Sequence, residues 1–137
     1  MDIIENCYVA SKTKYVELWK DLRDEGLPII STWIDEAGQE ETKCQKESFA
    51  KFSTEIQDCS LFILFAMDED IMKGSYIELG IAMSHNKPVI IYCEDLKQKN
   101  INSLMIMGYK NIICLVEGVP SKKNIIQTYE QYLIDLI

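Results

Sequence analysis

One stretch, LFILFA at residues 61–66, limits what this chain can fold into. Its six apolar residues lack the polar alternation of a strand with one wet face, which is typical of a strand that is covered on both faces. Similar apolar runs recur along the chain, and segments with helical spacing separate them. Unbroken apolar strands that alternate with helices favour a parallel sheet with helices on both faces.

The pattern accounts for five strands and four helices. The expected strands are residues 6–11, 27–33, 61–66, 88–93 and 111–116. The expected helices are residues 13–25, which Gly26 ends, and residues 42–58, 74–85 and 121–137. Five parallel strands fit a doubly wound α/β fold with the flavodoxin-like order 2-1-3-4-5. We expect a single domain over residues 1–137, because no linker or repeat interrupts the pattern.

Composition narrows the function classes. The 137 residues, 47% of them apolar, suit one domain with one core. The formal charge of −8, with lysines spread singly, argues against a polymeric nucleic acid as partner. No run of 18 apolar residues is present to span a membrane, and the acidic start lacks the bases of a secretory signal, so we expect a cytoplasmic protein. Five scattered cysteines and one histidine indicate no metal site.

Ligands of doubly wound sheets bind beyond the carboxyl ends of the strands, near the switch in strand order. We therefore expect a small-molecule cleft lined by the residues that follow the strands. The candidates are Ser11, Lys12 and Thr13 after the first strand, Trp33 and Asp35 after the second, and Asp70, Gly74 and Ser75 after the third.

Glu78 is the one carboxylate in the apolar helical run of residues 74–85, and two interpretations fit it. Ser75 and Glu78 match the S-x-x-E capping box, in which both side chains bond to backbone amides of the first turn. Alternatively, Glu78 faces the cleft and attacks an electron-poor sugar carbon. The positive end of the helix dipole would then give Glu78 a low pKa and keep it ionised.

Three other motifs also have two interpretations each. In residues 73–75, KGS, the glycine lets the backbone come close to a ligand, so that Ser75 and the helix amides hold a hydroxyl or phosphate. The alternative is an ordinary loop–helix junction. Residues 11–14, SKTK, suit an anion nest or a simple Ser/Thr helix cap. In one interpretation, a nucleobase stacks on the indole of Trp33 and Asp35 hydrogen-bonds to the edge of the base. In the other, both residues lie in an exposed loop.

GSYIELGIAMSHNKPVIIY, residues 74–92, resembles the signature of the nucleoside 2-deoxyribosyltransferase family. The residues that match are Glu78, Leu79, Gly80, Ala82, Lys87, Pro88 and Val89. INSLMIMGYKNII, residues 101–113, is similar to the family's later Asn-Leu-Met stretch and adds Asn102 as a substrate contact. The resemblance covers about a third of the chain. It implies the same five-strand architecture.

By this resemblance, Glu78 is the nucleophile that attacks the anomeric carbon, the base leaves, and a second base or water completes the transfer. Asp35 is the expected acid for the leaving base and Asp70 the alternative, since the family often has an Asp where this chain has Met72. No metal or cofactor is expected, because a carboxylate pair suffices for glycosyl transfer. The resemblance also implies a homo-oligomer with sites near subunit contacts.

The leading hypothesis is therefore a nucleoside or nucleotide deoxyribosyltransferase, or a hydrolase of the same kind. The second is a binding module that holds a nucleotide or nucleotide signal without turning it over, which Met72 favours. A third is an assembly protein with a vestigial cleft. NAD-cleaving TIR-type domains share a similar sheet and also use a glutamate, so NAD-like ligands stay open.

Overall fold

The computed structural model describes residues 3–37, 45–97, 101 and 104–137, and it is centred on a parallel sheet. The strands are β1 (Cys7–Ala10), β2 (Leu61–Ala66), β3 (Val89–Cys93) and β4 (Ile112–Glu117), in the order β1-β2-β3-β4. Every residue of β1, β2 and β3 is buried. The expectation of strands covered on both faces is confirmed for these three.

Six α-helices and one 3₁₀ turn are described. They are η1 (Thr13–Tyr15), α1 (Val16–Asp24), α2 (Trp33–Glu36), α3 (Gln45–Asp58), α4 (Gly74–Ser84), α5 (Leu104–Met107) and α6 (Lys122–Asp135). Gly26 follows α1 with a φ of +108°, a backbone conformation that glycine adopts without steric cost, so the expected helix end is confirmed.

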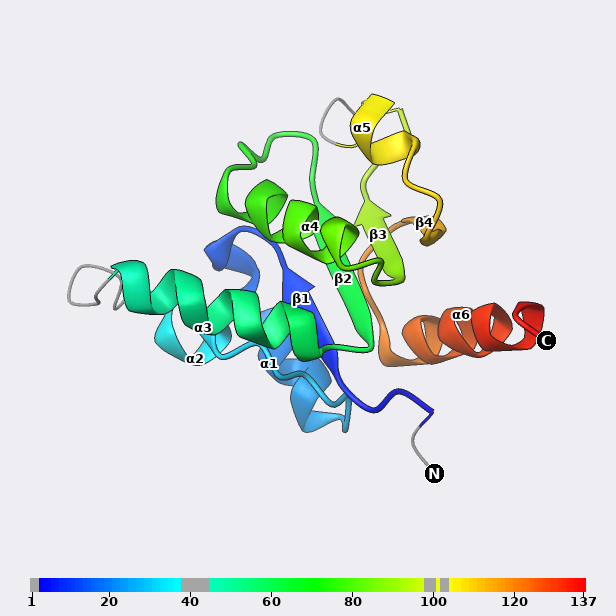
Figure 1. The fold of residues 1–137 in the computed structure, drawn as a ribbon, viewed down its shortest axis with the longest axis horizontal. Coiled ribbons are helices and arrows are strands. Elements are labelled where there is room, and N and C mark those ends of the chain that lie inside the picture. Colours follow the sequence, from blue (N-terminus) through cyan, green and yellow to red (C-terminus); the bar gives the residue numbers. More distant parts are fainter. Residues whose placement is uncertain (1–2, 38–44, 98–100, 102–103) are drawn as a thin grey trace.

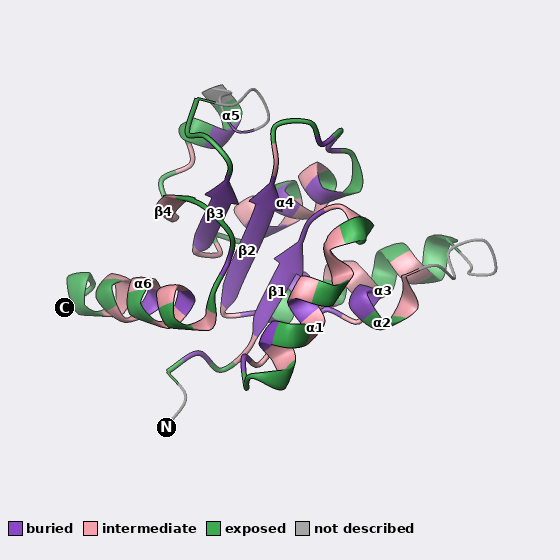
Figure 2. Cartoon of the chain, turned by 180° about the vertical axis from the view of Figure 1, so that it is seen from behind, coloured by how far each residue is buried: buried purple, intermediate pink, exposed green. Residues whose placement is uncertain are grey.

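The helices form a layer on each face of the sheet. α3 and α4 lie side by side over β1 and β2 (Figure 1). α1 covers the opposite face, as the view from behind shows (Figure 2). α6 joins this second layer, because Lys122 Nζ donates to the Glu25 carbonyl oxygen at 2.6 Å. The α/β class with helices on both faces is thus confirmed.

The expected strand at residues 27–33 is wrong. This segment lies beside β1, in the place of the second strand in the order 2-1-3-4-5, but it makes only one bridge, between Cys7 and Ile29. Side chains then replace the backbone partners. The Val9 amide donates to Ser31 Oγ at 2.7 Å, and the Trp33 indole nitrogen donates to the Val9 carbonyl at 2.7 Å. With the edge of β1 satisfied in this way, the chain turns into α2, and the sheet has four strands rather than five.

Candidate functional site

A cavity of about 470 Å³ lies beyond the carboxyl ends of β1 and β2, between α2, α3 and α4. This is where ligands bind in such sheets. Of the ten residues that the sequence singles out, seven line the cavity. They are Ser11, Lys12, Thr13, Trp33, Gly74, Ser75 and Glu78.

Glu78 extends from α4 toward the sheet, where the hydroxyl of Tyr8 donates a hydrogen bond to its Oε2. Tyr8 is buried in β1, and its ring stacks on Phe62 of β2 with the centroids 5.7 Å apart. α4 is preceded by Lys73 as N-cap and has no side-chain cap hydrogen bond. The capping-box interpretation of Ser75 and Glu78 is therefore wrong, because the carboxylate bonds across to β1 instead of back to its own helix.

The environment of Glu78 raises its pKa to about 7. Burial is the largest cause, since it disfavours the charged form, and the nearby Glu55 carboxylate acts in the same direction. The hydrogen bond from Tyr8 opposes both by stabilising the ionised form. The expectation of a low pKa is wrong, because at this position burial outweighs the helix dipole. Glu78 consequently changes charge near neutral pH, as the acid or base of an active site often does.

One end of the cavity, which we call the basic end, is formed by Lys12, Thr13, Lys73 and Ser75, with Gly74 between the last two. It joins the turn after β1 to the start of α4. Neither η1 nor α1 carries a side-chain cap hydrogen bond, so the interpretation of residues 11–14 as a Ser/Thr cap is wrong.

Ser11 serves the structure as well as the cavity. Its Oγ accepts from the indole nitrogen of Trp19 at 2.8 Å and donates to the Lys12 carbonyl oxygen at 2.9 Å. Because these bonds occupy the hydroxyl, Ser11 shapes the turn that presents Lys12 and Thr13 to the cavity.

Another part of the cavity lining is apolar, and the sequence analysis missed it. Its side chains are Phe49, Phe52 and Ile56 of α3 with Ile77 and Ile81 of α4. The helical spacing in the α3 segment predicts a helix but not what its apolar face contacts, and Phe49 is 59% exposed. An exposed aromatic ring beside a cavity is suited to stacking on a nucleobase. A core stripe and a ligand-facing stripe have the same spacing, so the pattern alone cannot separate them.

Trp33 lines the cavity from the first turn of α2, not from a strand end. It is 9% exposed, and its indole nitrogen is used by the Val9 carbonyl. Trp33 therefore forms part of the cavity wall with little ring surface free for stacking.

Asp35 does not line the cavity. Its two carboxylate oxygens accept from both terminal nitrogens of Arg23 at 2.8 and 2.9 Å, in a bidentate pair at the surface. The Arg23 guanidinium holds the pKa of Asp35 below its usual value. An acid for the leaving base needs a proton and a place in the cavity, and the structure gives Asp35 neither.

Asp70 is buried and also lies outside the cavity lining. Its Oδ1 accepts from the Tyr15 hydroxyl at 3.1 Å and lies 3.2 Å from Lys14 Nζ. Its Oδ2 accepts from the Met67 amide at 2.9 Å. These contacts tie the turn after β1 to the loop after β2. Asp70 thus joins the two segments that carry the basic end.

Asn102 lies outside the described residues. Among those that the structure does describe, no group of three or more His, Cys, Asp and Glu side chains is arranged to hold a metal ion. Within the same residues, no helix combines the length and apolarity that crossing a membrane requires.

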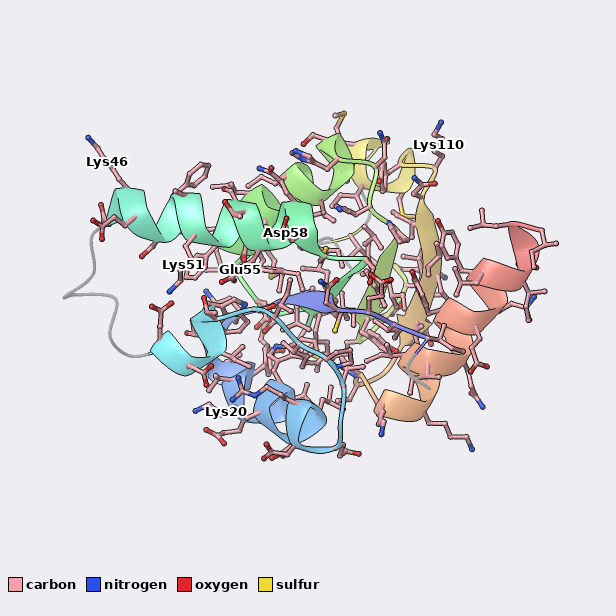
Figure 3. All side chains as sticks on the ribbon, turned by 60° about the horizontal axis from the view of Figure 1, so that its bottom comes forward. Lys20, Lys46, Lys51, Glu55, Asp58 and Lys110 are labelled. Carbon is pink, nitrogen blue, oxygen red and sulfur yellow. The ribbon has the colours of Figure 1, made fainter. Side chains whose placement is uncertain are left out.

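Glu36 of α2 is a further cavity residue that the sequence analysis missed. Its Oε1 lies 2.9 Å from Lys51 Nζ of α3. Figure 3 shows Lys51 extending from α3 toward α2. The pairing of the two helices at this point depends on tertiary structure, and no spacing in the sequence indicates it.

Comparison with known proteins identifies solved structures with a similar fold. No family model and no curated protein matches the sequence. Among solved structures, a CMP N-glycosidase from Clostridium botulinum, BcmB, matches with a TM-score of 0.61 and 18% identity, over 93% of this chain and 99% of that one. A 2-deoxyribosyltransferase from Bacillus psychrosaccharolyticus matches with a TM-score of 0.64 and 21% identity, over 82% of this chain and 86% of that one.

These similarities define the class of fold. The chain shares its α/β fold with the CMP N-glycosidase and the 2-deoxyribosyltransferase, and the resemblance seen in the sequence is confirmed at the level of the fold. At such identities the likeness concerns the fold, and the activity has to be argued from the cavity.

Proposed function

We propose that this protein cleaves the N-glycosidic bond of a nucleoside or nucleotide through Glu78 and passes the sugar to a second base or to water. The observation that carries the proposal is the carboxylate of Glu78 at the cavity, held by the Tyr8 hydroxyl. Among the described residues, no lysine or arginine lies within ion-pair distance of it. The fold shared with an N-glycosidase and a deoxyribosyltransferase supports the proposal.

The chemistry follows from the two oxygens of this carboxylate. Tyr8 binds Oε2, so Oε1 is the atom that attacks the anomeric carbon as the bond to the base breaks. The electron pair of that bond goes to the base nitrogen, which takes up a proton from water. The glycosyl ester on Glu78 is then attacked at the anomeric carbon by water or a second base, and the carboxylate is released.

Tyr8 positions the nucleophile in this proposal. Burial raises the pKa of the Tyr8 hydroxyl far above its ordinary value, so it keeps its proton and remains a donor. A donated hydrogen bond favours the ionised form of Glu78, which is the form that attacks. It also fixes the orientation of the carboxylate, which would otherwise rotate in the cavity.

A non-catalytic binding module is the second candidate, and the placement of the acids favours it. Asp35 and Asp70 both lie outside the cavity lining, and the position where the family often has an Asp is occupied by Met72, which is 9% exposed. A protein that binds a nucleotide without cleaving it needs the cavity but no acid for the leaving base.

A panel of nucleosides, their 5′-monophosphates and NAD separates the two candidates. Base release is measured by chromatography, and binding by the ligand-induced shift in melting temperature. We expect release from at least one member of the panel. A ligand that raises the melting temperature without any release would contradict the enzymatic proposal and support the binding module.

The homo-oligomer implied by the sequence resemblance stays a prediction. The end of α6 and the residues after it carry exposed apolar side chains, among them Ile134, Leu136 and Ile137. Multi-angle light scattering at micromolar concentration measures the mass directly. A monomer at about 100 µM would contradict the prediction, since the contact would then be weaker than roughly 6 kcal/mol.

A further inference from the structure

A second carboxylate, Glu55 of α3, lies near the pair formed by Glu78 and Tyr8, and the proposed chemistry does not use it. Burial raises the pKa of the Glu78 carboxyl most, the hydrogen bond from Tyr8 lowers it, and the charge of Glu55 raises it further. Glu55 also acts, after burial and Glu78, on the raised pKa of the Tyr8 hydroxyl. α3 and α4 pack against each other, and Figure 3 shows Glu55 on the side of α3 that faces the sheet. Glu55 and Tyr8 therefore act on Glu78 from two different elements.

Two hydrogen bonds from a single residue fix the Glu55 carboxylate. Its Oε1 accepts from the Thr32 amide at 3.1 Å, and its Oε2 accepts from the Thr32 hydroxyl at 2.7 Å. The residues on either side of Thr32 are in turn hydrogen-bonded to the backbone of Val9, which follows Tyr8 in β1. These bonds hold the Glu55 carboxylate at a set position relative to the strand that carries Tyr8.

Within the described part of the chain, no cation pairs directly with this carboxylate. Lys51 lies one turn earlier on α3, but its Nζ lies 2.9 Å from Glu36 Oε1 and so is directed toward α2. The titratable groups that interact electrostatically with Glu55 are Tyr8 of β1, Lys51 of α3 and Glu78 of α4. The charge of Glu55 thus acts on Glu78 without a counterion in contact.

A fixed negative neighbour matters because Glu78 loses its charge in the proposed reaction. Its Oε1 bonds to the anomeric carbon while the electron pair of the bond to the base passes to the base nitrogen, which takes up a proton from water. Glu78 is an anion before this step and a neutral ester after it. Repulsion from Glu55 raises the energy of the anion and not that of the ester, so it favours formation of the bond.

We propose that Glu55 is a positioning residue that acts through Glu78: its fixed carboxylate repels the charge of the nucleophile and so favours transfer of the sugar to Glu78. The inference rests on the proposed function, because it needs Glu78 as the nucleophile. Protonation and glycosylation remove the same charge from Glu78. Removing Glu55 should therefore weaken the binding of a proton and the bond to the sugar by a similar factor.

Glu55→Gln removes the charge and keeps the shape of the side chain and an oxygen that accepts from Thr32. Carbon-13 NMR of the Glu78 carboxyl, assigned with Glu78→Gln, measures its pKa without turnover. We expect this pKa to fall by about 0.5–1 unit. The midpoint of base release against pH should move down equally, and the plateau at high pH should fall by about 3- to 10-fold. A variant that only disturbed the fold would lower release at every pH and leave the midpoint in place.

Three further variants separate charge from other effects. Glu55→Met is a second charge-free variant, for which we expect the same shift. Glu55→Asp keeps the charge and should retain a midpoint close to that of the wild type, even where the shorter side chain weakens the bonds to Thr32. Glu47→Gln is the matched control, because it removes the same charge from an exposed position about two turns earlier on α3. It should leave both the titration and the release profile unchanged, and melting temperatures check that each variant folds.

An unchanged pKa of Glu78 in both charge-free variants would overturn this inference, as would an equal shift in Glu47→Gln. Base release by the wild type with an unmoved midpoint in Glu55→Gln would leave the proposed function standing and remove Glu55 from it. If the NMR titration moves as expected but the wild type releases no base, the proposed function fails, and the role of Glu55 in the reaction fails with it.

Discussion

Asp70 and Glu78 are eight residues apart on either side of the start of α4, and the structure holds them in different ways. Asp70 is surrounded by donors, namely the Lys14 ammonium, the Tyr15 hydroxyl and the Met67 amide. Glu78 has the Tyr8 hydroxyl and a neighbouring carboxylate, and its pKa is raised to about 7. A cation beside a buried carboxylate makes it a structural anchor, whereas burial without one leaves it reactive.

The two carboxylates should respond very differently to loss of their charge. Glu78→Gln should lower base release by about 10³-fold or more, because an amide does not attack the anomeric carbon. Asp70→Asn should retain turnover and instead destabilise the fold by about 1–3 kcal/mol, since it weakens buried hydrogen bonds to a charged group. Release assays and urea unfolding on the same preparations measure both effects.

Asp35→Asn is the matched control for this pair, because Asp35 is a carboxylate outside the cavity with a surface partner, Arg23. It should leave turnover unchanged, with a stability change below about 1 kcal/mol. Loss of turnover in Asp70→Asn with retention in Glu78→Gln would reverse the assignment of the two residues.

Stability as a function of pH should also separate Glu78 from Asp70. The pKa of Glu78 is about 7 in the folded protein against an ordinary value of 4.5, so the folded state binds the proton more tightly than the unfolded state. The stability that this supplies is present in full below pH 4.5 and is lost as pH rises through 7. Between those limits the wild type should lose up to about 3 kcal/mol relative to Glu78→Gln.

Urea unfolding of both proteins from pH 4.5 to pH 8 under reducing conditions measures this difference. Glu78→Gln should therefore be the more stable protein at pH 8, because only the wild type then has to bury an ionised carboxylate. A difference that does not change with pH would mean that Glu78 stays ionised throughout.

Removing the hydrogen bond to Glu78 should have a smaller effect. The bond from Tyr8 lowers the pKa of Glu78, so Tyr8→Phe should raise that pKa, by about one unit. Because the ionised carboxylate attacks, base release should rise with pH through about 7 in the wild type and at higher pH in the variant. Tyr132→Phe on α6 is the control and should leave the pH profile in place. An unshifted profile in Tyr8→Phe would remove Tyr8 from the positioning of Glu78.

The sequence was sufficient for the parts of the fold that depend on local patterns. Apolar runs located β1 to β4, and helical spacing located α4 and α6. It failed at residues 27–33, where strand propensity was high but the hydroxyl of Ser31 and the indole of Trp33 took over the backbone partners of β1. Such substitutions depend on which side chains meet in space, and propensity does not record them.

The candidate site, like the fold, was predicted only in part from the sequence. The rule that ligands bind at the carboxyl ends of strands correctly predicted that Lys12, Ser75 and Glu78 line the same cavity. The partner of Glu78 is Tyr8, 70 residues away in a strand that looks like uniform core. The prediction that Asp35 and Asp70 line the cavity failed for a related reason. Each carboxylate is held by a basic partner, Arg23 for Asp35 and Lys14 for Asp70, and the sequence does not show these pairings.

The central claim is that Glu78 forms a covalent bond to the sugar. It is tested most directly by acid-quenching the wild-type protein during turnover and measuring its intact mass, followed by peptide mapping. The account predicts a mass increase equal to one glycosyl group on the peptide that contains Glu78, and no such increase in Glu78→Gln. Base release without an adduct in the wild type, together with undiminished release by Glu78→Gln, would contradict it.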